Sequence, residues 1–132
     1  MIDIPEERIL KEITDILMND LPKVLLELEE QSEDSIRLPP FRYVGLEENL
    51  SPGTGLPYAF VEIEEVNCSL KDRIIRNREN KIRVKLLLVS KQYFLKYSHC
   101  VNKTLKECFD SWKIMNYHMS KSNQSADFVL KK

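Results

Sequence analysis

Two stretches of the chain, residues 58–66 and 81–89, alternate between apolar and polar side chains, the period of a β-strand with one buried face. The charged side chains on their outward faces are Glu62, Glu64, Arg83 and Lys85. If the stretches pair antiparallel, the carboxylates of the first lie opposite the cations of the second. Each such pair contributes about 0.2–1 kcal/mol, which helps to fix the register. The sequence therefore predicts an antiparallel pair with one solvated face, and these four residues are candidate interaction residues.

Helical periodicity surrounds these two strands. Residues 6–31 carry apolar side chains at the spacing of a 3.6-residue period, and Pro22 predicts a kink or break near it. A second amphipathic helix is expected at 93–112, followed by short strands at 114–119 and 126–130. The order helix, strand, strand, helix, strand, strand predicts an α+β fold: a small, mostly antiparallel sheet of about four strands packed by two helices.

The 132 residues are enough to bury one hydrophobic core and too few for two, so we expect a single domain spanning residues 1–132. It divides into an N-terminal helical region at 6–31, an extended Pro- and Gly-rich segment at 32–57, and a sheet-and-helix body at 58–132. The extended segment is long for a loop in a small domain. Such loops are often functional or contact another chain.

Charge is distributed unevenly although its total is only −1. Residues 1–65 hold sixteen acidic and five basic side chains, whereas residues 66–132 hold five acidic and fifteen basic ones. Two interpretations remain open. The halves fold against each other and their fields largely cancel, or an acidic face of one copy meets a basic face of the next in a head-to-tail contact that can close into a ring.

The connector between the two predicted strands is the most basic part of the chain. Residues 71–85 contain seven basic and two acidic side chains. The candidate interaction residues within this connector are Lys71, Arg73, Arg76 and Arg78. Aromatic residues do not alternate with these charges, so any contact with DNA would be non-specific, to phosphates, and dependent on salt. A solvated hairpin and contact with an acidic neighbour are both consistent with the pattern.

Groups with catalytic or metal-binding potential are few and scattered. His99 and His118 have no ligand spacing to a second histidine or cysteine, and the three cysteines form no CxxC pair. We therefore predict no catalytic, cofactor or metal residues, no disulfide framework and no structural zinc. A carboxylate–metal hydrolase that uses Glu62 and Glu64 is an alternative, but the cations expected opposite them would neutralise such a site.

No apolar run approaches the ~20 residues that a membrane-spanning helix needs, so no membrane association is expected. The N-terminus has neither the basic start nor the apolar stretch of a secretory signal. Besides an enzyme and a structural protein, a small binding or regulatory module that engages an acidic protein or nucleic acid fits the composition.

Read in order, several segments resemble one family. They are LPKVLLELEE in the first helix, LPPFRY in the extended segment, GLPYAFVEIEEV and KIRVKLLLV at the strands, and the basic connector between them. In order and spacing, the chain is similar to the tail terminator and tail-completion proteins, the small head–tail joining or neck proteins of long-tailed bacteriophages.

That resemblance implies a structural virion protein without catalytic activity, from a phage or prophage. It would form a homo-oligomeric ring, often a hexamer, that contacts the tail tube and head-completion proteins and, non-specifically, the DNA passing through. Its location would be the head–tail junction of the virion, with the host cytoplasm as the site of assembly. Family members commonly have an acidic lumen, so a basic connector facing inward would depart from the pattern.

Overall fold

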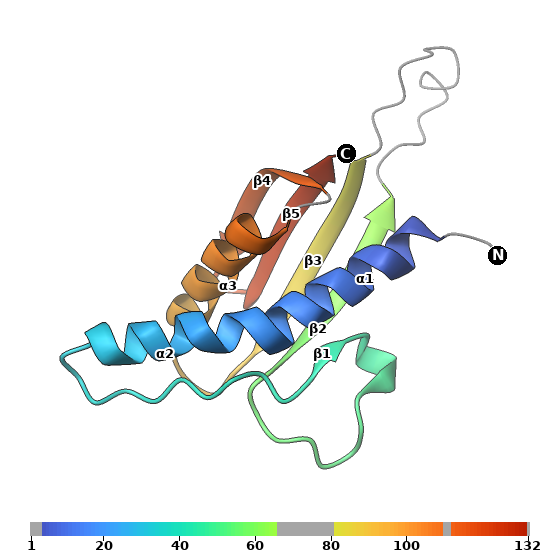
Figure 1. Cartoon of the computed structure of the whole chain (residues 1–132). Helices are drawn as coiled ribbons and strands as arrows, with labels where there is room; N and C mark the ends of the chain where they lie inside the picture. Colours follow the sequence, from blue (N-terminus) through green and yellow to red (C-terminus); the bar gives the residue numbers. More distant parts are fainter. Residues whose placement is uncertain (1–3, 66–80, 110–111, 132) are drawn as a thin grey trace, which may run out of the picture.

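The computed structural model describes residues 4–65, 81–109 and 112–131. Its centre is a five-stranded mixed sheet with helices packed on one face only (Figure 1). The strands are β1 (Val44–Gly45), β2 (Tyr58–Glu65), β3 (Lys81–Val89), β4 (Lys113–Ser120) and β5 (Ser125–Lys131). The α+β class expected from the sequence is confirmed.

The sheet has the strand order β1-β2-β3-β5-β4. All neighbouring strands are antiparallel except β1, which runs parallel to β2 with Val44 opposite Ala59. The prediction of about four strands in the order helix, strand, strand, helix, strand, strand is therefore wrong in detail. A short fifth strand lies within the segment that was expected to be extended loop, and it makes the sheet mixed.

The N-terminal helical region is continuous. It consists of α1 (Pro5–Asp15), a π-helical turn η1 (Ile16–Asp20) and α2 (Leu21–Gln31). At the junction the N–H of Leu21 donates to the carbonyl of Ile16, five residues earlier, which widens the turn just before Pro22. Where the sequence suggests a kink or break, the helix therefore continues through a single π-helical turn, a rare form that occurs mostly as a bulge inside an α-helix.

The second long helix, α3 (Phe94–Cys108), is shorter than expected. Phe109 has an extended backbone (φ −86°, ψ 96°), so the helix ends there. Trp112, which has the helical spacing of the apolar stripe, is instead buried immediately before β4. The Trp112 ring can be buried without a helical backbone at this position. The apolar periodicity therefore predicts a helix that is longer than the one observed.

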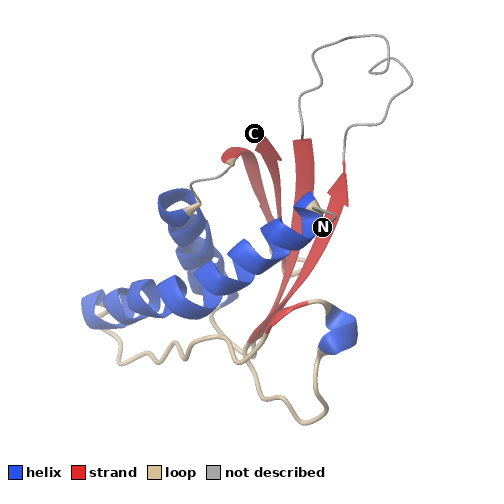
Figure 2. Cartoon of the chain, turned by 45° about the vertical axis from the view of Figure 1, so that its right-hand side comes forward, coloured by secondary structure: helices blue, strands red, loops and turns tan. Residues whose placement is uncertain are grey.

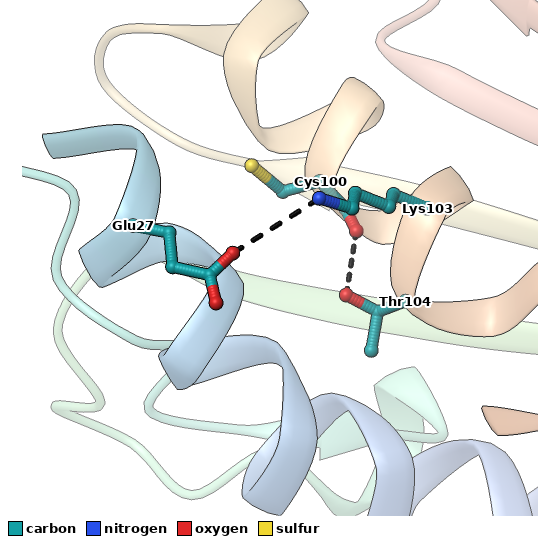
Figure 3. Close-up of polar contacts among 4 residues, drawn as sticks. All are labelled: Glu27, Cys100, Lys103 and Thr104. Atoms are coloured by element: carbon teal, nitrogen blue, oxygen red, sulfur yellow. Dashed lines mark hydrogen bonds and ion pairs between the residues drawn. The ribbon is translucent and has the colours of Figure 1, made fainter. Parts of the chain in front are cut away.

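Helix α2 contacts α3, which packs on the sheet, and the two helices cross steeply (Figure 2). Between them the ammonium group of Lys103 lies 4.0 Å from a carboxylate oxygen of Glu27, both half-exposed (Figure 3). Inside α3, the Thr104 hydroxyl donates a 2.6 Å hydrogen bond to the carbonyl of Cys100. An exposed pair of this kind contributes less than about 1 kcal/mol. The helices are held chiefly by the apolar side chains beneath them.

One cluster of buried side chains lies between the helices and the sheet. Its largest fully buried members are Ile9, Ile13, Leu17, Leu21, Leu25, Val61, Val84, Leu86, Leu88, Leu105, Phe128 and Leu130. The strand members alternate along β3 as the period-two pattern requires, with even-numbered residues inward. The odd-numbered residues of β3 consequently point to the opposite face of the sheet.

The segment 32–57 contacts the helices through hydrogen bonds and ring stacking. The Tyr97 hydroxyl donates a 2.7 Å hydrogen bond to the carbonyl of Pro39, and the rings of Phe41 and Tyr97 stack with centroids 5.5 Å apart. The N–H of Leu38 donates to the Glu29 carboxylate. After these contacts the chain forms β1 and then the 3₁₀ helix η2 (Glu47–Asn49), which lies beside the sheet.

Candidate functional site

The candidate site is the face of the sheet that none of the described helices α1, α2 and α3 packs against, here called the open face (Figure 2). Four of the residues selected from the sequence lie on it, and all four side chains are exposed. Glu62 is directly opposite Lys85, and Glu64 is directly opposite Arg83. The register predicted from the charge pattern is therefore confirmed. The acidic half of the chain and the basic half meet at this strand pair.

The row that contains Glu62 and Lys85 continues across the sheet. Lys85 on β3 is opposite Asp127 on β5, and Asp127 is opposite His118 on β4. Side chains directly opposite each other in a sheet have Cβ atoms about 4.5–5.5 Å apart. Four ionisable groups from four strands thus form one line, in the order Glu62, Lys85, Asp127 and His118.

One end of the open face is apolar. The rings of Tyr58 and Phe60 lie 5.2 Å apart, and the ring of Tyr43 meets Phe60 edge-on at 6.4 Å. These contacts explain why Phe60 is 92% buried although no helix covers it. A Cβ atom at Gly45 would lie 2.8 Å from the Tyr43 hydroxyl, which donates to the carbonyl of Leu46, so a larger residue there would displace the Tyr43 ring.

The middle of the open face is hollowed. The hollow has a volume of about 1280 Å³, and η2 forms part of its rim. The ionisable residues that line it are Glu47, Glu48, Glu62, Glu64, Arg83, Lys85, His118 and Asp127. Pockets for small molecules are typically ~300–1,000 Å³ and mostly apolar. This surface is larger, more open and more charged than such a pocket.

The other end of the open face carries three lysines in one row. Lys81 on β3 is opposite Lys131 on β5, and Lys131 is opposite Lys113 on β4. We call these three residues the lysine row. The sequence alone does not bring these lysines together, because they are far apart in the chain. One sequence feature points to two of them: Lys113 directly precedes the first predicted C-terminal strand and Lys131 directly follows the second, so antiparallel pairing would bring them together.

The other candidate interaction residues, Lys71, Arg73, Arg76 and Arg78, lie outside the described residues. The structure therefore brings together Glu62, Glu64, Arg83 and Lys85 but gives no position for the basic connector that precedes β3.

The cysteines and histidines of the described residues do not converge. Cys100 is buried, and burial raises the pKa of its thiol, whereas a reactive cysteine needs a lowered pKa. His99 is exposed on α3 and His118 on the open face. Within 4–65, 81–109 and 112–131, no group of three or more histidine, cysteine or acidic side chains could hold a metal ion. Across the same residues, none of the helices has the length and apolarity to cross a membrane.

Comparisons with known proteins give no further guide to the site. No protein-family model matches the chain, and neither does any curated protein.

Proposed function

We propose that this protein is a non-catalytic structural subunit that binds protein surfaces, including those of its own copies. In this proposal it forms a ring at the head–tail junction of a phage or prophage, as a tail terminator or neck component.

The observation that carries the proposal is the open face. It spans four long strands, is hollowed in the middle and carries charges of both signs, exposed on β2, β3 and β4 and half-buried on β5. Interfaces between proteins have an apolar part, a polar rim and complementary charges that fix orientation. The aromatic end, the alternating charged row and the lysine row supply these three features on one surface.

The head–tail location rests on the resemblance in segment order, not on the open face. The same resemblance gives the tail tube and head-completion proteins as partners beside the chain's own copies. It also gives non-specific contact with passing DNA and a virion location. Charge complementarity between unlike surfaces of identical subunits is compatible with a ring, because head-to-tail contacts close when the rotation between subunits allows it.

Multi-angle light scattering of the full chain at low and high salt tests the proposal. The expected result is an oligomer larger than a dimer at low salt that dissociates as salt screens its contacts. A chain that stays monomeric at every concentration and salt but retains duplex DNA tightly would instead be a binding module. A divalent-ion-dependent hydrolytic activity that Glu62→Gln abolishes would replace the structural proposal with a catalytic one.

A further inference from the structure

Strand β4 forms one edge of the sheet, and within residues 4–65, 81–109 and 112–131 no strand pairs with its outer side (Figure 1). A bulge between Ile114 and Asn116 interrupts the beginning of β4 and leaves residues 116–120 regular. The outer backbone groups of an edge strand can pair with another chain, and native proteins protect such edges with bulges, lysine or proline. The regular part of β4 contains neither lysine nor proline. This edge is therefore suited to pairing with a further strand.

The opposite edge of the sheet is only partly covered. β1 pairs with β2 at Ala59 and Phe60 alone, so none of the described strands lies outside the rest of β2. The N–H of Ala59 donates to the carbonyl of Tyr43, on the side away from β3. Because the backbone groups of alternate residues point the same way along a strand, those of Val61 and Ile63 also point outward.

The outward backbone groups of β4 follow from the hydrogen bonds of β5. The carbonyl of Gln124, just before β5, accepts a hydrogen bond from β3. The backbone groups of Asp127, three residues later, therefore point the other way, toward β4. His118 is opposite Asp127, so its backbone groups point toward β5 and those of its neighbours Tyr117 and Met119 point outward.

The two edges match in strand direction. Each of β2, β3, β5 and β4 is antiparallel to the next, so β4 runs antiparallel to β2. A second copy placed beside the first in the same orientation therefore brings its β4 antiparallel to β2. The outward residues of the two edges, Val61 and Ile63 on β2 and Tyr117 and Met119 on β4, pair completely in one register, with Val61 opposite Met119.

The side chains on the open face are complementary in the same register. It places His118 opposite Glu62 and Asn116 opposite Glu64, and all four side chains are exposed. Imidazole and amide N–H groups can donate hydrogen bonds to a carboxylate. The row that runs from Glu62 to His118 then continues into Glu62 of the next copy.

We infer that β4 of one copy pairs in this register with the uncovered part of β2 of a second copy, so that the sheet continues from subunit to subunit. The inference rests on the proposed function and names the surfaces that join the subunits. Because the two edges are unlike, the contact runs head to tail and can close into a ring. Pairing of β4 with another β4 would give a two-fold dimer and leave the edge of β2 uncovered.

Engineered disulfides test this contact directly. In the inferred register Glu62 and His118 form a pair without backbone hydrogen bonds, in which the Cα atoms are about 4.5 Å apart, within the range of a disulfide. Within one copy they are three strand spacings apart, about 14 Å, which is too far to link. Oxidation of the double variant Glu62→Cys/His118→Cys should therefore give trimers and longer species on a non-reducing gel.

Three controls accompany the double variant. The unsubstituted chain, with its three native cysteines, gives the background, which the double variant should exceed at least tenfold. Each single variant should add no species longer than a dimer. Lys85→Cys/His118→Cys is the matched pair, because Lys85 is equally exposed on the open face but lies on the interior strand β3, and it should stay at background.

Met119→Pro tests the backbone pairing itself. Proline removes the outward N–H of residue 119 and is tolerated where an edge strand faces solvent. In light scattering at low salt it should convert the oligomer to monomer, whereas Met119→Ala, which keeps the N–H, should leave the oligomer intact. Equal losses in the two variants would contradict pairing through the backbone.

The outcomes separate this inference from the proposed function. An oligomer that Met119→Pro leaves intact, with the double cysteine variant linking no further than its single variants, would overturn the inference and leave the proposed function standing. A monomer in light scattering at every salt concentration, with disulfide linking at background, would overturn both.

Discussion

The Tyr97 hydroxyl on α3 donates a 2.7 Å hydrogen bond to the carbonyl of Pro39, a residue that lies 58 positions earlier in the chain. The Tyr97 side chain is almost fully buried, and its ring also stacks on Phe41. This contact joins the second long helix to the segment that leads into β1. It thereby helps to position the edge of the sheet on which Tyr43 and η2 lie.

Tyr97→Phe removes this hydrogen bond while it keeps the ring. The carbonyl of Pro39 then loses its donor, so we expect the free energy of unfolding to fall by about 0.5–1.5 kcal/mol. Urea denaturation followed by circular dichroism measures the change. Tyr93→Phe is the matched control, because Tyr93 is exposed at the start of α3, and it should change stability by less than about 0.5 kcal/mol. Equal losses in the two variants would contradict the role given to this hydrogen bond.

Stability at alkaline pH should depend on the same residue. Burial, followed by the nearby Glu29 carboxylate and Cys100, raises the pKa of Tyr97 to about 12, from a reference value of 10.0. The unfolded chain therefore ionises this tyrosine first, and the free energy of unfolding falls as the pH rises from about 10 to about 12. Urea titrations across this range should show a smaller fall in Tyr97→Phe. An identical fall in both proteins would mean that Tyr97 does not titrate differently on folding.

Leu86 tests the core under the helices. It is fully buried at the centre of β3, between Val61 on β2 and Ala126 on β5. Leu86→Ala leaves a cavity and should lower the free energy of unfolding by about 2–5 kcal/mol. Leu26→Ala removes the same atoms from a side chain that is 54% exposed on α2 and should change stability by less than about 0.5 kcal/mol. Thermal unfolding of both variants gives the comparison.

The pair Glu62 and Lys85 tests the register of the open face. A double-mutant cycle with Glu62→Gln and Lys85→Gln should give a coupling energy of about 0.2–1 kcal/mol that shrinks at high salt. The diagonal pair Glu64 and Lys85 serves as the control, since these residues are not directly opposite each other. A larger coupling for the diagonal pair would indicate a different register.

Much of the sheet could be predicted from the sequence because apolar and polar side chains alternate along β2 and β3 with the period of a β-strand. β3 occupies the expected residues 81–89, and the charges on β2 and β3 fix which residues face each other. β1 could not be predicted. It has two residues, Val44 and Gly45, and it exists only because β2 offers backbone groups to pair with. A strand stabilised by a distant partner leaves no periodic signal of its own.

The site was predictable only in part, for a related reason. Glu62, Glu64, Arg83 and Lys85 could be placed together because they sit on consecutive strands of predictable register. The lysine row depends instead on β5 lying between β3 and β4 in the sheet. Local patterns fix which side chains share a face of one strand but not which strands become neighbours. Asp127 joins the charged row for the same topological reason.

Native mass spectrometry of the full chain is the most direct measurement of the central claim, that this molecule acts by joining unlike surfaces of its own copies. At low ionic strength we expect one closed oligomer of fixed size, larger than a dimer, which dissociates to monomer as the ionic strength rises. A spectrum that contains only monomer, or only a two-fold dimer, under all solution conditions would contradict it.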